Sequence, residues 1–417
     1  MTDQTHFRER ITVIETVRKI ARALGPGLIV AAIVLGPGSI TSISATGSLL
    51  GNNLLWIVLL SGIFMLTYTI LSAKFGTANR STFLTVVAER YGRWLAVLIG
   101  VCAFLCCAGF QWGNNLGVGM AMNALLGGPT WLWAVVFTVL SISFLFYFRS
   151  LYEAIEKLMM ALVILMIVAF VSNLVVAGPD PVDVAAGFIP ERIDTELIPL
   201  VAAIVATSFS VFGAIFQSYL VQEKNWGREQ AGQGIRDSVV GIAALTLISA
   251  VVMITSATVL HSRGIQVRSA ADMATQLEPL LGRAAKWLFC LGLWGASFSS
   301  FLGNAVLGGT LLSDGLGTGG KIGGRPAKYI ASVIMLIGMT VAVASRRFSP
   351  VNSIIVAQAV TVIAVPLACF MIFWLSNRRD LMGEDRPSWW VNLLAVGGLV
   401  SVCLLSVNTL KNILGKL

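Results

Sequence analysis

Charged residues are scarce in this chain of 417 residues, because Asp, Glu, Lys and Arg together make up only 12% of it. An average soluble domain contains about 25%. Hydrophobic residues make up 56%, so the chain lacks the polar side chains that would cover an ordinary water-exposed surface. These proportions exclude a soluble globular protein and predict an all-α integral membrane protein whose main partner is the lipid bilayer.

Cysteine and histidine are also few, with six Cys and two His. The Cys residues lie in apolar segments and form no Cys-x-x-Cys pair, which argues against a zinc site or a disulfide framework. Both histidines, His6 and His261, fall outside the predicted membrane core. Because no nucleophile–base set and no cluster of metal ligands is present, the sequence predicts no enzyme, no cofactor and no resident metal centre.

Long apolar segments dominate the rest of the chain. A membrane-spanning helix needs roughly 20 mostly apolar residues. Eleven windows fit this requirement after an N-terminal cytoplasmic segment, 1–24, whose residues from Phe7 to Leu24 are predicted to form an amphipathic helix. The predicted spans are 25–46, 53–73, 94–124, 130–148, 158–178, 197–221, 237–260, 286–312, 328–345, 352–376 and 388–410.

The positive charges predict the orientation of these spans. With the N-terminus inside, the cytoplasmic segments contain 20 of the 29 Lys and Arg residues, as the positive-inside rule requires. An odd number of spans then places the C-terminus outside the plasma (cytoplasmic) membrane. The net charge of +9 is explained by the cytoplasmic leaflet, so nucleic acid is not predicted as a partner.

The first predicted span is interrupted in its middle by Gly36, Pro37, Gly38 and Ser39. Proline lacks the N–H of a helical hydrogen bond, and the flanking glycines lower the helix propensity further. We therefore expect the helix to unwind at Pro37–Ser39. Unwound backbone at membrane depth occurs where it is buried or lines a polar cavity, although a simple kink would have the same sequence.

The sixth predicted span has a similar interruption at Thr207, Ser208, Ser210 and Gly213, and we expect it to unwind near Ser210–Gly213. Paired interruptions in equivalent helices are typical of transporters built from two inverted repeats, with the binding site between them. The sequence thus predicts a first repeat at 25–178 (helices 1–5), a second at 197–376 (helices 6–10) and an additional helix at 388–410. A receptor or structural protein would not require the paired interruptions.

Other polar residues inside the spans could line the site, although residues of this kind also hold helices together. Carboxylates are absent from the first, third, sixth and eighth spans, so these spans offer neither anionic metal ligands nor the usual proton carriers. The additional candidates are Gln111, Asn114 and Asn115 in the third span, Ser297, Ser299, Ser300 and Asn304 in the eighth, and Asn352 and Gln358 in the tenth.

Several of these segments resemble the Nramp family of divalent metal transporters, which has a LeuT-type fold with a 5+5 inverted repeat and broken helices 1 and 6. Gly25-Pro26-Gly27 and the break that follows are similar to the family's first helix. The resemblance covers most of the chain and implies a transporter that works by alternating access. The other matching segments are Ala73–Gly92, Tyr152–Met166, Ser218–Gln222, Glu278–Gly282, and Gln358 with Pro366.

The chain departs from the family at the residues that bind metal. Where the family's first helix has Asp-Pro-Gly-Asn, Gly36 replaces the Asp and Ser39 replaces the Asn. The Met-Pro-His of the sixth helix and the acidic residues of the third are also missing. The residues in their place are Ser210, Val211 and Phe212 in the sixth helix, and Trp112 and Asn115 in the third.

Two functional hypotheses follow. The first is an Nramp-like secondary transporter that has changed its substrate to a small organic anion or polar metabolite, with a coupling ion. The alternative is a divalent metal transporter that binds a largely hydrated cation through neutral oxygens. The predicted substrate-binding residues are Gly36, Gly38, Ser39, Thr41, Asn115, Ser208, Ser210, Phe212, Gly213 and Gln358.

Overall fold

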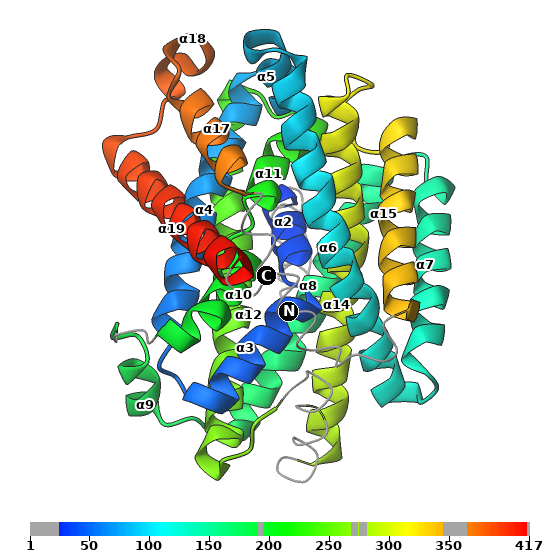
Figure 1. Ribbon diagram of the computed structural model, residues 1–417, viewed down its shortest axis with the longest axis vertical. Helices are drawn as coiled ribbons and strands as arrows, with labels where there is room; N and C mark the ends of the chain where they lie inside the picture. Colours follow the sequence, from blue (N-terminus) through cyan, green and yellow to red (C-terminus); the bar gives the residue numbers. More distant parts are fainter. Residues whose placement is uncertain (1–24, 191–194, 268–273, 275–281, 345–364, 415–417) are drawn as a thin grey trace, which may run out of the picture.

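The computed structural model describes residues 25–190, 195–267, 274, 282–344 and 365–414. All regular secondary structure in these ranges is helical, and no strand occurs in them. The helices run side by side along the long axis of the molecule (Figure 1). The predicted N-terminal helix at Phe7–Leu24 and the predicted site residue Gln358 lie outside the described residues.

The observed helices agree with the eleven predicted spans. Nine helices of the described chain are long and apolar enough to cross a membrane, one bent pair can form a tenth span, and a shorter apolar helix, α17, falls in the tenth predicted window. The helices that follow the bent pair are α4 (Leu55–Ala78), α6 (Arg93–Leu126), α7 (Thr130–Tyr147), α8 (Leu151–Ala177), α10 (Ile198–Ser208) with α11 (Val211–Glu223), α12 (Ala231–Val259), α14 (Arg283–Gly315), α15 (Arg325–Ala344), α17 (Val365–Asn377) and α19 (Trp389–Leu414).

The bent pair is the first predicted span, which divides into α2 (Pro26–Val34) and α3 (Pro37–Leu50) with an angle of 59° between them. The non-helical residues are Leu35 and Gly36, so the prediction that Pro37–Ser39 would unwind is wrong. Pro37 instead begins α3, because its fixed φ suits the first position of a helix and its missing N–H would have no partner there.

The second interruption separates α10 from α11 at Phe209 and Ser210. Ser210 is the N-cap of α11, and its Oγ accepts a hydrogen bond from the N–H of Gly213 at 3.2 Å. The prediction of an unwound Ser210–Gly213 is therefore wrong for Val211, Phe212 and Gly213, which are helical. A serine hydroxyl favours the start of a helix because it bonds one of the unpaired N–H groups there.

Two helices begin well before their predicted starts. The helix α8 begins at Leu151 rather than at 158, and α12 begins at Ala231 rather than at 237. The extension of α8 carries Glu156, which is only 9% exposed, into the bundle, and the extension of α12 moves Asp237, the first residue of the predicted span, into the interior of a helix, where it is 0% exposed. The central helix α14 packs against α6, α8 and α15, whereas α19 lies at the periphery with apolar side chains exposed.

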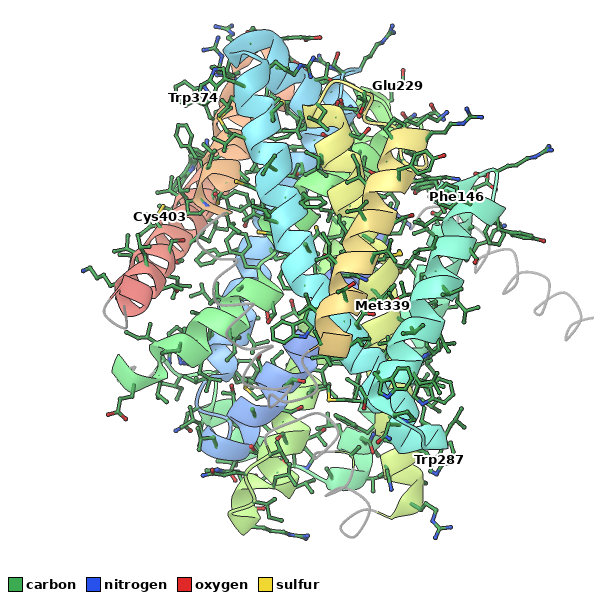
Figure 2. The ribbon with its side chains drawn as sticks, turned by 45° about the vertical axis from the view of Figure 1, so that its right-hand side comes forward. Phe146, Glu229, Trp287, Met339, Trp374 and Cys403 are labelled. Carbon is green, nitrogen blue, oxygen red and sulfur yellow. The ribbon has the colours of Figure 1, made fainter. Side chains whose placement is uncertain are left out.

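Short helices mark the two ends of the bundle. At the end predicted to be cytoplasmic lie α5 (Phe83–Tyr91) and α18 (Arg379–Met382), and at the opposite end lies α9 (Pro181–Ala186) (Figure 1). Side chains project outward from the sides of the bundle, among them Phe146, Trp374 and Cys403 (Figure 2).

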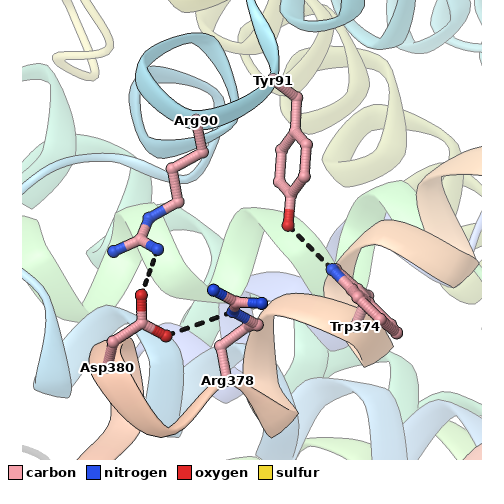
Figure 3. Close-up of polar contacts among 5 residues, drawn as sticks. All are labelled: Arg90, Tyr91, Trp374, Arg378 and Asp380. Atoms are coloured by element: carbon pink, nitrogen blue, oxygen red, sulfur yellow. Dashed lines mark hydrogen bonds and ion pairs between the residues drawn. The ribbon is translucent and has the colours of Figure 1, made fainter.

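Polar contacts join α5 to the end of α17 and to the segment that follows it (Figure 3). Asp380 forms ion pairs with Arg90 and with Arg378, and the Trp374 Nε1–H donates to the Tyr91 hydroxyl at 2.8 Å. The hydrogen bond from Arg90 lowers the pKa of Asp380 below its ordinary value. These contacts fix the position of α5 over the end of the bundle.

A buried carboxylate also holds α5 against the bundle. Asp314 of α14 accepts hydrogen bonds from the Tyr219 hydroxyl at 2.6 Å and from the Thr85 hydroxyl at 2.7 Å. The Tyr219 oxygen in turn accepts from the N–H of Leu84 at 3.2 Å. Helices α5, α11 and α14 are thus tied together beneath the face predicted to be cytoplasmic.

Candidate functional site

The two helix interruptions border one small cavity at the centre of the bundle. Its free space is about that of a single water molecule. No charged side chain is among the lining residues that the structure describes. The cavity is lined by Ile33, Val34, Gly36, Ser39, Phe110, Asn114, Thr207, Ser210, Ser300 and Asn304.

Two polar atoms of the cavity residues have no hydrogen-bond partner. The Ser39 Oγ and the Asn114 Nδ2 are both buried, and each side chain is 2% exposed. Buried polar groups in proteins are normally bonded to protein or to ordered water. These two unpartnered atoms therefore indicate that the cavity accommodates water or a polar ligand.

Polar side chains of α14 bond the backbone carbonyls that are left unpaired where α2 ends. In a continuous helix the N–H of residue 37 would bond the carbonyl of Ile33, but Pro37 has no N–H. The carbonyl of Ile33 instead accepts from Ser300 Oγ at 2.6 Å and from Asn304 Nδ2 at 3.3 Å.

The carbonyl of Ala32 also lacks its helical partner, because the N–H of Gly36 bonds the carbonyl of Val34 instead. Ser299 Oγ donates to the Ala32 carbonyl at 2.9 Å. These α14 side chains complete the hydrogen bonding of a helix that ends inside the membrane.

The four helix ends create a mixed electrostatic field at the cavity. The C-terminal ends of α2 at Val34 and of α10 at Ser208 contribute partial negative charge, whereas the N-terminal ends of α3 at Pro37 and of α11 at Val211 contribute partial positive charge. An ion of either sign can thus find a complementary helix end. The oxygens of the lining side chains and the helix carbonyls are hard ligands, suited to hard cations.

Three of the predicted site residues, Gly36, Ser39 and Ser210, line the cavity. Phe212 lines an adjacent pocket together with Ser210, Cys106 and Cys107. The others that the structure describes are not lining residues of the central cavity: Gly38, Thr41, Asn115, Ser208 and Gly213.

Two neighbouring residues of α6, Asn114 and Asn115, point in different directions. Asn115, which was predicted to bind substrate, turns toward α7, where its Oδ1 accepts from Thr138 at 3.1 Å and its Nδ2 donates to the carbonyl of Gln111 at 2.9 Å. Asn114 faces the cavity in its place. Adjacent residues of a helix point about 100° apart, so a signal of two consecutive Asn residues could not decide between them.

Gly36 lies where a side chain would enter the cavity. A Cβ atom built on Gly36 would lie 2.7 Å from Ser300 Oγ and 3.4 Å from Asn114 Oδ1. In the described part of the chain, no group of three or more His, Cys, Asp or Glu side chains is arranged to hold a metal ion. The described residues of the site therefore offer a cation neutral oxygens and no carboxylate.

Comparison with known proteins agrees with this architecture. The manganese transporter of Eremococcus coleocola superposes with a TM-score of 0.81 at 18% identity, over 95% of this chain and 87% of that one. A nucleobase-cation-symport-1 family transporter superposes with a TM-score of 0.60 at 16% identity, over 94% of this chain and 93% of that one. Both likenesses establish the LeuT-type fold that the sequence predicts.

Similar sequences span nearly the whole chain. The divalent metal cation transporter MntH of Deinococcus radiodurans is 25% identical over 405 residues, covering 94% of this chain and 89% of its own. The protein of the same name from Xanthomonas campestris pv. campestris is 26% identical over 395 residues, covering 91% and 88%. The family described as natural resistance-associated macrophage protein-like, Nramp, matches residues 27–412, and the chain therefore belongs to the Nramp family.

Proposed function

We propose that this protein carries a divalent metal ion across the membrane and holds the ion, with part of its hydration shell, through neutral oxygens. The observation that carries the proposal is the cavity at the helix break, which is the size of one water molecule and contains the unpartnered Ser39 and Asn114 side chains. The names of the curated relatives, divalent metal cation transporters, support the same substrate class.

The expected organic anion is less well supported than the alternative. A metal ion is a single atom, so the free space of this cavity holds the ion, whereas a small carboxylate, like any waters that the ion retains, needs the site to open further. A hard cation can be coordinated by hydroxyl, amide and carbonyl oxygens, and Mg²⁺ in particular keeps several of its waters in protein sites. The negative ends of α2 and α10 supply attraction that would otherwise come from a carboxylate.

The proposed mechanism is alternating access by secondary transport in the plasma membrane. The segments 25–178 and 197–376 would act as inverted repeats, with the broken first and sixth spans moving around the site. Twenty of the 29 Lys and Arg residues lie in segments that this orientation makes cytoplasmic, which supports an N-terminus inside and a C-terminus outside.

Uptake into proteoliposomes tests the proposal. Purified protein is assayed with Mn²⁺, Mg²⁺ and Ca²⁺, and in parallel with radiolabelled acetate and lactate. We expect uptake of at least one divalent ion, and a KM raised about tenfold by the double variant Ser39→Ala/Asn114→Ala, because two polar groups are removed from the cavity. Each lost hydrogen-bonding group typically costs about 0.5–1.5 kcal/mol.

The matched control is Ser42→Ala. Ser42 also lies on α3 and its Oγ is also buried and unpartnered, but the residue does not line the cavity. Uptake of carboxylate without uptake of metal would overturn the proposal. An equal effect of Ser42→Ala and of the double variant would show that the cavity is not the binding site.

A further inference from the structure

The first turn of α2 is held by a carboxylate from another helix. The Asp237 side chain of α12 accepts hydrogen bonds from the N–H of Gly25 at 2.8 Å and from the N–H of Gly27 at 2.6 Å. The N–H groups of a first helical turn have no partner within their own helix. Asp237, which is 0% exposed, therefore caps a helix from 210 residues away in the sequence.

Helices α2 and α12 also touch through their backbones at this point. A Cβ atom on Gly27 would lie 2.7 Å from the carbonyl carbon of Asp237, and one on Gly241 would lie 2.8 Å from the Cα of Gly27. No side chain larger than hydrogen fits at either glycine without a shift. The end of α2 that is predicted to face the cytoplasm is therefore closed against α12 as long as the Asp237 bonds persist.

The other partner of Asp237 is an amide. Gln217 Nε2 donates to Asp237 Oδ2 and to Ser238 Oγ, both at 3.2 Å. The Oε1 atom of the same amide is buried and has no partner. All three groups bonded to the carboxylate are thus N–H donors, which suits a charged carboxylate and not a protonated one.

In the described part of the chain, Asp237 forms no ion pair. Lys224, the residue that follows α11, lies 2.6 Å from Glu156 of α8 and forms its ion pair there. Helices α2, α3 and α10 contribute no titratable side chain to the contact with α12. The titratable groups on the remaining described elements near this end of α12 are Tyr152, Glu153, Glu156 and Lys157 on α8, Glu223 on α11 with Lys224 directly after it, Lys74 on α4, and Arg228 and Glu229 in the turn η2 (Arg228–Gln230).

We propose that Asp237 is a proton-binding site that couples protonation to the release of α2 from α12. A proton on Oδ2 makes that oxygen a donor, which opposes the N–H groups of Gly27 and Gln217 that face it, while Oδ1 remains an acceptor for Gly25. Rotation of the Gln217 amide would present its free Oε1 as the acceptor of that proton. The bonds to Gly25 and Gly27 then lose their charge-assisted strength, and the negative charge at the positive end of α2 disappears.

The ligand is a proton rather than a metal ion, because both carboxylate oxygens face N–H groups that cannot coordinate a cation. The sequence alone predicted no proton carrier in the first, third, sixth and eighth spans, and Asp237 lies in none of them. The assignment of this proton as a coupling ion rests on the proposed transport function. The proton-dependent release of α2 is independent of that function and can be measured without any substrate.

Hydrogen–deuterium exchange of the purified full-length protein tests the release. Protection of the amides in Gly25–Val34 is measured between pH 5 and pH 8 and corrected for the intrinsic exchange rate at each pH. We expect protection in the parent protein to fall about tenfold at the acidic end, since bonds to a charged acceptor are stronger than bonds to a neutral one. In Asp237→Asn, protection should be low and independent of pH.

Two further variants keep the result decisive. Asp314→Asn neutralises another buried carboxylate near the same end of the bundle, but Asp314 bonds hydroxyl groups and does not contact α2, so this control should follow the parent curve. Asp237→Glu keeps a titratable group, and it should shift the pH midpoint. A pH response that survives in Asp237→Asn, or a midpoint unchanged in Asp237→Glu, would overturn the proposal, as would the absence of any response in the parent.

Metal uptake under an imposed pH gradient separates the two proposals. We expect a gradient that is acidic on one side to stimulate uptake by the parent and to have no effect on Asp237→Asn. A pH-dependent release of α2 without metal uptake would refute the proposed function and leave the Asp237 site standing. Metal uptake that responds to the gradient equally in both proteins would refute the Asp237 site alone.

Discussion

A carboxylate placed at Gly36 should strengthen metal binding. A Cβ atom at this position points toward Asn114 Oδ1, 3.4 Å away, and lies 2.7 Å from Ser300 Oγ. The second distance is too short, so Ser300 must rotate away from the Ile33 carbonyl. Substituting Ser300 by Ala removes the closest contact and leaves one of 3.2 Å to the Cβ of residue 300, while Asn304, 3.3 Å from the same carbonyl, still satisfies it.

The expected gain in the free energy of Mn²⁺ binding is the attraction between the carboxylate and the ion, minus the cost of burying the carboxylate. A carboxylate about 4 Å from a divalent ion gains about 8 kcal/mol at an effective dielectric constant of about 20. Burying the carboxylate costs several kcal/mol. A remainder of about 1–3 kcal/mol predicts that Gly36→Asp/Ser300→Ala binds Mn²⁺ roughly tenfold to a hundredfold more tightly than the parent.

Isothermal titration calorimetry with Mn²⁺ measures this gain, and uptake into proteoliposomes reports whether the ion is still released. The matched control is Gly36→Asn/Ser300→Ala, which has nearly the same shape and no charge. Equal Mn²⁺ affinity in the Asp and Asn variants would refute the reasoning, because the cavity would then not contain the ion. Weaker metal binding in the Asp variant would refute it more directly.

Two further predictions concern stability. The double variant Ser300→Ala/Asn304→Leu leaves the carbonyl of Ile33 without its two donors, and it should lower the free energy of unfolding by about 1–3 kcal/mol, seen as a lower midpoint of thermal unfolding in detergent. Ser300→Ala alone should cost less, and equal losses in the two variants would contradict the shared role. The lowered pKa of Asp380 beside Arg90 stabilises the folded state above the unfolded pKa of about 3.9, and this contribution is lost as the pH falls through the lower folded pKa. Asp380→Asn should therefore reduce stability at pH 7, and the loss should shrink as the pH falls below the unfolded pKa; a loss that is the same at pH 7 and in strong acid would exclude the ion pair as its cause.

The spans were predictable from the sequence because twenty apolar residues in a row have few alternatives to a membrane helix. The existence of both interruptions was also predictable, since Pro37 and the cluster around Ser210 weaken a helix locally. Their positions were misjudged by one to three residues. Pro37 and Ser210 were taken as the first residues of the two breaks, whereas Pro37 begins α3 and Ser210, the last residue of its break, caps α11.

The buried carboxylates were not predictable in the same way. A charged residue normally marks the end of a membrane span, so the predicted starts of α8 and α12 were drawn at or after Glu156 and Asp237. The partners that make burial acceptable come from distant segments: Lys224 for Glu156, and the N–H groups of Gly25 and Gly27 for Asp237. Only the folded chain brings these groups together.

The hydrogen bonds from α14 to the Ile33 carbonyl fix one end of α2, so the helix can tilt around that end. Ser300 and Asn304 hold the carbonyl at one end of the helix, while Asp237 holds Gly25 and Gly27 at the other. Eight residues separate Gly25 from Ile33, which corresponds to roughly 12 Å along a helix. Tilting α2 by about 20° around Ile33 would displace its free end by roughly 4 Å, comparable to the diameter of a hydrated passage one water molecule wide, while the cavity end of the helix stayed in place.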